Sequence, residues 1–267
     1  MAFYQYGIVT TANQLVADFK ILAEANGWTI DLFTTYLTYN RVHLHKGSSH
    51  FEVYATAGTA FSVVGCTGYS SGAIPTAQPG ATAAKDTGYV TANYGFCLIS
   101  TAGGLYIGHF SNGHNYWCWA GICTLQAKIG TWADGIICFN SYSQPFNISA
   151  YTSGESQLYI NGAWTPSVAA GGFCGSVGSD LDMCAKQPME YNAGILPIPI
   201  TLFVRLVTDY TKFQPIGFAP GMYRCNGGNI YTTAEEIPVG ADTYLIMPCN
   251  GATIGLSSHD LLFKLGA

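Results

Sequence analysis

Short apolar segments separated by glycine, asparagine and serine make up most of the chain from Trp28 onward. Regularly spaced short strands with turns between them are typical of β-sandwiches and β-barrels. In the middle of the chain the expected strands are 96–100, 106–110, 116–125, 135–140 and 157–160. Towards the C-terminus they are 201–208, 222–224, 229–232 and 243–247, with a turn at 214–221. We therefore predict a mainly β protein with a sandwich or barrel-like body.

One amphipathic helix is expected before these strands, over residues 11–26. Thr11 and Gln14 fit a capping box, in which the threonine hydroxyl accepts a hydrogen bond from a backbone amide of the first turn. An Asn-Gly pair at 26–27 ends the helical pattern. The apolar face at helical spacing comprises Leu15, Val16, Phe19, Leu22 and Ala23. The N-terminal part is therefore expected to be α+β.

A β-hairpin is expected from two segments of alternating period, 41–45 and 50–54, joined by a short turn. His43 and His45 alternate on the first segment and His50 lies just across the turn, so the three imidazoles share one face. Three imidazoles suffice for a zinc or nickel site. Without a fourth ligand in the pattern, a solvent-facing edge is the commoner arrangement, so we expect no bound metal and no cofactor.

Two long stretches rich in glycine and small residues interrupt the strand pattern, at about 65–94 and 171–194. We expect them to run over the surface and to be ordered by a neighbouring subunit, because such long loops are unusual inside an isolated domain. A segment with two prolines follows at 195–200 and fits an edge strand or a linker. The expected organisation is a β-rich body over 1–194 with a C-terminal β subdomain over 195–267 packed on it, or else a single domain.

The charge of the chain excludes one class of partner. The chain has ten Lys and Arg residues and fifteen Asp and Glu residues. No basic stripe is available to neutralise several phosphates, so we expect no binding of nucleic acid. The N-terminal residues show neither the cationic nor the apolar region of a secretory signal, and no apolar stretch reaches roughly 18 residues. We therefore expect no signal peptide and no membrane span.

The best match to a catalytic motif is Gly-x-Ser-x-Gly at 68–72, with Ser70 as the nucleophile. Candidate partners downstream are Asp180, Asp182, Asp242 and His259. A nucleophile elbow needs a helix directly after the serine, and the two prolines within 73–79 prevent one. We expect a turn at Ser70, no catalytic residues and no enzymatic activity, with a serine or cell-wall hydrolase as the remote alternative.

Three tryptophans, Trp117, Trp119 and Trp132, are candidates for an aromatic contact surface. Indole rings stack on the apolar faces of sugars, and they also anchor cores and subunit interfaces. Trp117 and Trp119 point to the same side of one expected strand. We expect packing to be their main role, with carbohydrate contact as the alternative.

Four stretches near the two ends of the chain resemble virion structural proteins of tailed bacteriophages. They are Ile21-Leu-Ala-Glu-Ala-Asn-Gly27-Trp28-Thr-Ile-Asp31, Leu44-His-Lys-Gly47 with Phe51, Pro215-Ile-Gly-Phe-Ala-Pro-Gly221-Met-Tyr223, and Tyr244-Leu-Ile-Met-Pro248. In that family a helix runs into a Gly-Trp-x-Ile-Asp strand and a hairpin before a β-rich body, and a Gly-x-x-Pro-Gly-x-Tyr turn precedes the closing strands. The match covers about the first 55 and the last 60 residues. Its motifs mark a fold and carry over no site residues.

The resemblance implies a non-enzymatic structural component of a tailed-phage particle, in the neck, the collar or a tail accessory position. Its partners would be further copies of itself in a ring and other virion proteins. It would be made in the host cytoplasm and located in the virion. Charged residues make up only 9% of the chain, which agrees with a surface that mostly contacts neighbours. A receptor-binding or fibre-type module that contacts host glycan is the alternative.

Nine cysteines are an odd number, so a closed set of intramolecular disulfides is not expected. Most are expected to be buried thiols. The alternative is a set of intersubunit disulfides that form once an assembled phage particle leaves the reducing cytosol of its host. The candidates, which lie in or beside the two long stretches, are Cys66, Cys97, Cys174 and Cys184.

Overall fold

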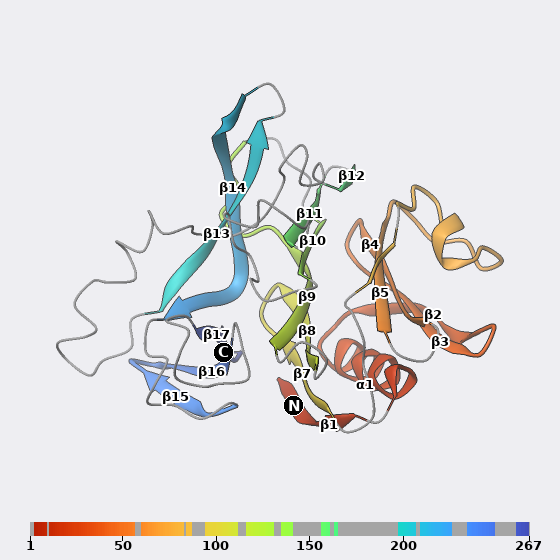
Figure 1. Ribbon diagram of the computed structural model, residues 1–267, viewed down its shortest axis with the longest axis horizontal. Helices are drawn as coiled ribbons and strands as arrows, with labels where there is room; N and C mark the ends of the chain where they lie inside the picture. Colours follow the sequence, from red (N-terminus) through yellow and green to blue (C-terminus); the bar gives the residue numbers. More distant parts are fainter. Residues whose placement is uncertain are drawn as a thin grey trace.

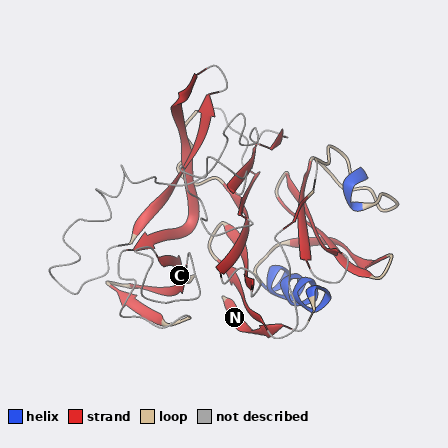
Figure 2. Ribbon diagram, in the orientation of Figure 1, coloured by secondary structure: helices blue, strands red, loops and turns tan. Residues whose placement is uncertain are grey.

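The computed structural model describes residues 3–9, 11–56, 60–82, 84–86, 94–111, 116–130, 135–140, 156–160, 163–164, 197–206, 209–225, 234–248 and 260–266. Within these residues the chain forms three antiparallel sheets, one α-helix and the short 3-10 helix η1 (Pro75–Ala77) (Figure 2). The predicted fold class is confirmed, because the protein is mainly β with a single helix near the N-terminus. No helix in this part of the chain is long and apolar enough to cross a membrane.

Helix α1 (Ala12–Ala25) begins where the capping box predicts. The amide of Gln14 donates to Thr11 Oγ1 over 3.2 Å, and Asn26 caps the C-terminal end. The expected apolar face is buried against both the first and the middle sheet (Figure 1). Its buried residues are Ala12, Leu15, Val16, Phe19, Leu22 and Ala23.

The first sheet follows the helix and keeps its strands in chain order. They are β2 (Thr29–Tyr36), β3 (Tyr39–Lys46), β4 (Ser49–Thr56), β5 (Ala60–Cys66) and β6 (Lys85–Asp86). Strands β3 and β4 form the predicted hairpin. Val42 and Leu44 on β3, with Phe51 and Val53 on β4, belong to the core beneath α1. Because side chains alternate along a strand, the residues between them lie on the opposite face.

The middle sheet has the order β1-β7-β8-β9-β10-β11-β12. Its strands are β1 (Tyr4–Val9), β7 (Tyr94–Ser100), β8 (Gly104–Ser111), β9 (Tyr116–Thr124), β10 (Gly135–Asn140), β11 (Ser156–Ile160) and β12 (Ala163–Trp164). Strand β1, which precedes the helix in the chain, pairs with β7 and forms one edge. The strand expected at 157–160 corresponds to β11, and the other expected strands of this region also have counterparts.

Strands β7 to β9 of the middle sheet are buried on both faces. Phe96 and Leu98 pack in the core shared with α1 and the first sheet, whereas Cys97 and Ile99 pack in the core shared with the third sheet. Because successive residues face two different apolar cores, these strands read as continuous apolar runs without polar alternation.

The third sheet has the order β13-β14-β17-β16-β15 and packs on the middle sheet (Figure 1). Its strands are β13 (Ile198–Leu206), β14 (Asp209–Cys225), β15 (Glu236–Val239), β16 (Asp242–Pro248) and β17 (Asp260–Lys264). Thr101 Oγ1 and Tyr106 Oη both donate to the Pro220 carbonyl over 2.8 Å and so join the two sheets. All strands of the third sheet lie beyond residue 195, while the division into two domains stays a prediction.

The turn expected over 214–221 is wrong, because these residues belong to the long strand β14. The register between β13 and β14 shifts at several points, and Gly217 and Gly221 have φ angles of 148° and 70°. Bulges and left-handed glycines bend a strand without ending it. The two prolines near 195–200 precede or enter β13, which is an edge strand as expected. The expected strand 229–232 lies outside the described residues.

A glycine beneath an aromatic ring gives a testable feature of the middle sheet. Tyr106 on β8 pairs with Gly121 on β9, and a Cβ added to Gly121 would stand 2.5 Å from the Tyr106 ring. Gly121→Ala should therefore lower the free energy of unfolding by about 1–3 kcal/mol through overpacking. Urea denaturation followed by circular dichroism measures this change. Gly72→Ala is the control, since a Cβ there meets nothing within 4 Å, and equal effects of both changes would contradict the packing.

Candidate functional site

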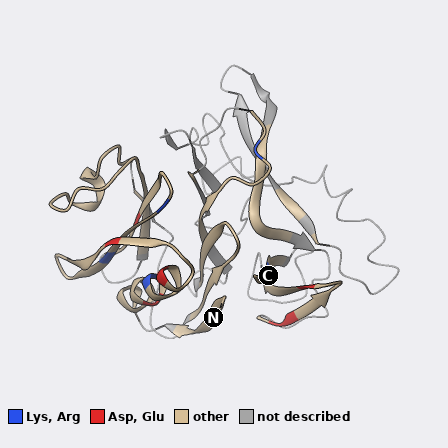
Figure 3. Cartoon of the chain, turned by 180° about the vertical axis from the view of Figure 1, so that it is seen from behind, with Lys and Arg blue, Asp and Glu red and all other residues tan. Residues whose placement is uncertain are grey.

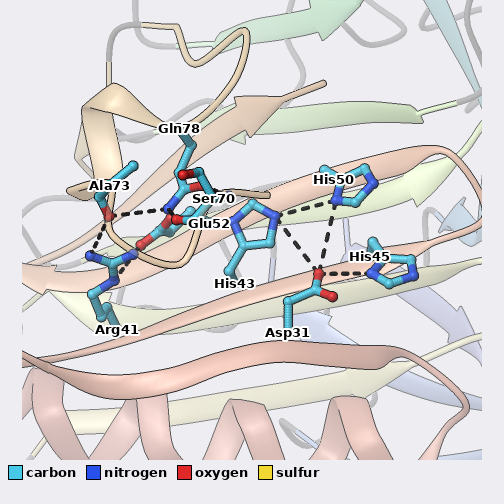
Figure 4. A network of polar contacts seen from close by, with 9 residues as sticks. All are labelled: Asp31, Arg41, His43, His45, His50, Glu52, Ser70, Ala73 and Gln78. Atoms are coloured by element: carbon cyan, nitrogen blue, oxygen red, sulfur yellow. Dashed lines mark hydrogen bonds and ion pairs between the residues drawn. The ribbon is translucent and has the colours of Figure 1, made fainter. Parts of the chain in front are cut away.

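Ionisable side chains gather on the face of the first sheet that lies opposite the core under α1 (Figure 4). Asp31, His43, His45 and His50 are named the histidine cluster below. The register of the β3–β4 hairpin places His45 directly opposite His50. Because opposite residues of an antiparallel pair share a face, the predicted meeting of the three imidazoles is confirmed. The expected solvent-facing edge is wrong, since His43 is fully buried and β3 and β4 are inner strands of the sheet.

Asp31 reaches the histidine cluster from a β-bulge in β2. Ile30 pairs with Leu44 and Leu32 pairs with His43, so the register shifts by one residue and Asp31 is left without a cross-strand partner. A bulge bends its strand and re-aims the side chains beside it, a device that recurs next to functional sites. Here it sets the Asp31 carboxylate among the histidines of β3 and β4.

One oxygen of Asp31 lies within reach of all three imidazoles. His45 Nδ1 is 2.7 Å from Asp31 Oδ2, a hydrogen-bonding distance. The same oxygen is 3.9 Å from His50 Nδ1 and 3.9 Å from His43 Nε2. His43 Nε2 also stands 3.3 Å from His50 Nδ1. One carboxylate oxygen therefore lies within 3.9 Å of a nitrogen of each of the three rings.

A buried ion pair supports the inner side of the histidine cluster. His43 Nδ1 lies 3.3 Å from Glu52 Oε2, and Glu52 Oε1 lies 2.7 Å from Arg41 Nε. Arg41 Nη1 in turn donates to the Ala73 carbonyl over 3.0 Å. The side chains of His43 and Glu52 are fully buried and that of Arg41 nearly so. This chain of contacts fixes the orientation of the His43 ring.

The segment 67–82 continues this polar face above β3 and β4. The buried Gln78 side chain accepts from the amide of Ser70 and donates to the carbonyls of Ser70 and Ala73. The Tyr69 ring lies 5.0 Å from the His43 ring, centroid to centroid. These contacts hold the described part of the first long stretch against β3 and β4, and its ordering by a neighbouring subunit stays a prediction.

The environment favours the neutral form of one histidine. Burial lowers the pKa of His50 below its ordinary value, and neighbouring His45 and His43 lower it further, while Asp31 acts in the opposite direction. A neutral imidazole is the form that binds metal ions. His45 and His50 retain side-chain exposures of 25% and 18%, so an ion can reach them from solvent.

Chemically, the histidine cluster is suited to hold a divalent cation. The donor atoms of Asp31, His45 and His50 all lie within 4.8 Å of one another. The alternating histidines were visible in the sequence, but Asp31 was missed as the carboxylate partner. Its signal was weak, because a lone Asp in a strand pattern does not reveal which strand lies beside it.

The tryptophan predictions have different outcomes. Trp119 on β9 is fully buried in the core between the middle and third sheets. It therefore has no exposed face for a glycan, and the expected contact surface is wrong for this residue, whereas its expected packing is confirmed. The side chains of Trp117 and Trp132 lie outside the described residues.

Of the four cysteine candidates for intersubunit disulfides, the structure describes two. Cys66 and Cys97 are buried free thiols. Burial, with a contribution from Glu52, raises the pKa of Cys66 to about 12, and burial also raises the pKa of Cys97. Their expected burial is confirmed: Cys97 lies in the core between the middle and third sheets, and Cys66 lies opposite His50, on the same face of the first sheet as the histidine cluster. Cys174 and Cys184 lie outside the described residues, and their role stays a prediction.

Ser70 occupies the kind of turn that the sequence predicts. The residues after it form a turn and then the single 3-10 turn η1, not the helix of a nucleophile elbow. Of its candidate partners, Asp242 is paired with Lys264 in the third sheet over 2.7 Å. Asp180, Asp182 and His259 lie outside the described residues.

Neither the comparison with protein-family models nor the comparison with curated proteins finds a match to this chain.

Proposed function

We propose that this chain is a non-enzymatic structural component of a tailed-phage particle, in the neck, the collar or a tail accessory position, and that it acts through contacts with further copies of itself and with other virion proteins. The proposal combines the resemblance at the two ends of the sequence with one feature of the structure. That feature is the outer edge of the middle sheet.

Strand β1 supports the proposal because it is an apolar edge strand with exposed side chains. It pairs with β7 on one side, and no described strand pairs with its other side. Ile8 is 66% exposed and Tyr6 46% exposed. The strand contains no lysine and no proline, the residues with which proteins usually protect an edge from pairing with another chain. An edge of this kind is suited to accept a strand from a second copy.

The sparse charge of the surface supports the same proposal. Among the residues that Figure 3 colours, Lys, Arg, Asp and Glu are few, in line with 9% charged residues in the whole chain. Typical soluble domains carry roughly 25%. Charged residues are depleted where a protein surface becomes the core of an interface.

Native mass spectrometry of the purified chain tests self-assembly, with Ile8→Lys as the decisive variant. We expect a ring-sized oligomer for the original chain and a monomer for Ile8→Lys, because a lysine on an edge strand opposes strand pairing. Ile129→Lys is the matched control at another exposed isoleucine and should leave the oligomer intact. A monomer for the original chain would contradict its self-assembly, and a trimer would favour the fibre-type module.

Repeating the measurement without reductant tests the disulfide prediction. A multimer that only reductant dissociates would indicate intersubunit disulfides, with Cys174 and Cys184 as the remaining candidates. Nine free thiols in intact particles would contradict this prediction.

A further inference from the structure

We propose that the histidine cluster is a structural zinc site in which Asp31, His43, His45 and His50 bind one Zn²⁺ ion and thereby join strands β2, β3 and β4. This inference revises the expectation of no metal, which rested on the lack of a fourth ligand. It does not depend on the proposed function.

Four of the six pairs of donor atoms lie within about 0.6 Å of the spacing that a tetrahedral ion requires, and the donor atoms of Asp31, His45 and His50 all lie within 4.8 Å of one another. Zinc binds imidazole nitrogen and carboxylate oxygen at about 2.0–2.2 Å, so its four ligands stand about 3.3 Å apart. His43 Nε2 and His50 Nδ1 are already 3.3 Å apart, and each is 3.9 Å from Asp31 Oδ2. The pair formed by His45 Nδ1 and Asp31 Oδ2, at 2.7 Å, is a hydrogen bond. A zinc ion would replace its proton and separate the two atoms by about 0.6 Å.

Glu52 prepares His43 as a ligand. In the zinc-bound form the proton of the His43 ring belongs on Nδ1, because that nitrogen faces the buried Glu52 carboxylate at 3.3 Å. The lone pair is then on Nε2, the nitrogen that lies near Asp31 and His50. A carboxylate that accepts from the second nitrogen of a ligand histidine is the usual support of a zinc site, since it fixes both the ring and its tautomer. Arg41 holds Glu52 in place from the other side.

Four protein donors distinguish this site from a catalytic one. Catalytic zinc sites keep a position open for water or substrate, whereas structural sites fill all four with side chains. Three nitrogens and one oxygen also favour zinc over calcium or magnesium, which take oxygen ligands. The expected effect of the ion is stability of the first sheet, because the bound state is available only when the three strands are paired.

A zinc titration of the full chain tests the proposal. The chain is stripped with a chelator, kept in a phosphine reductant and titrated with Zn²⁺ alone in competition with a chromophoric chelator. We expect one ion per chain and a melting temperature that rises with the zinc concentration. His50→Gln and His45→Gln, at two partly exposed positions, should each weaken binding by more than about 100-fold, since each removes a ligand. Glu52→Gln should weaken it by about 10–100-fold.

The controls separate this site from the nine thiols and from misfolding. Asp31→Asn should lose zinc binding, whereas Asp242→Asn, which alters a carboxylate paired with Lys264 in the third sheet, should keep it. Circular dichroism of the zinc-free variants checks that each is folded. Co²⁺ in place of zinc should give tetrahedral visible bands without the near-ultraviolet absorption of thiolate ligands. Absence of zinc binding, binding unchanged in the histidine variants, or thiolate absorption would each overturn the proposal.

Discussion

We expect Trp119→Ala to lower the free energy of unfolding by about 3–5 kcal/mol, the range for removing a large aromatic side chain from a core. The indole is fully buried and its ring lies 5.2 Å from that of Phe263, centroid to centroid. Opposite it stands Gly108, where an added Cβ would approach the indole to 2.6 Å. The alanine variant leaves a cavity beside Gly108, and this glycine has no side chain that could fill it. Urea denaturation of the reduced chain measures the loss.

A matched change on the surface separates core packing from a general effect of losing apolar volume. Ile21→Ala on helix α1 removes a side chain that is mostly exposed, so it should change stability by less than about 0.5 kcal/mol. Trp119→Phe should keep part of the stability, because a smaller ring still fills part of the site. A loss below about 1 kcal/mol in Trp119→Ala would contradict the core position and restore the surface interpretation.

Local signals in the sequence predicted the elements whose causes are local. The capping box at Thr11 and the period of the apolar residues after it determine helix α1, and the alternation at 41–45 and 50–54 determines the β3–β4 hairpin. Only the end of β14, at 222–224, was predicted as a strand, because the glycines and prolines before it read as a turn and only pairing with β13 and β17 keeps such a segment extended.

Long-range packing decided the features that the sequence left open. Burial of Trp119 and of Cys97 was predicted from their residue types, but the apolar run around Cys97 does not reveal that its two faces meet two different sheets. The composition of the histidine cluster also depends on contacts that are distant in the sequence. Alternation brings three histidines together within one hairpin, whereas Asp31 joins them only through the register and bulge of a third strand.

Removing the positive charge of the buried ion pair should be as costly as losing the core tryptophan. In Arg41→Met the Glu52 carboxylate keeps His43 as a neighbour but loses the guanidinium that lies 2.7 Å away. A charge left buried without its partner typically costs about 3–5 kcal/mol. The variant also removes the donor to the Ala73 carbonyl, which anchors the segment 67–82. We expect the free energy of unfolding in urea to fall within this range.

Two comparisons assign the loss to the unpaired charge. The double variant Arg41→Met with Glu52→Leu should recover most of the stability, because a buried ion pair can be exchanged for apolar side chains at little cost once both charges are gone. Lys20→Met breaks the solvent-facing pair of Lys20 with Glu24 on helix α1, and an exposed pair of this kind contributes less than about 1 kcal/mol. If the double variant were as unstable as Arg41→Met, the charge argument would be wrong, and the loss would come from the missing donor to Ala73 or from His43 left without Glu52. Recovered stability in the double variant would show that Arg41 compensates the free-energy cost of burying the charged Glu52 carboxylate. Glu52 needs this compensation to remain beside His43.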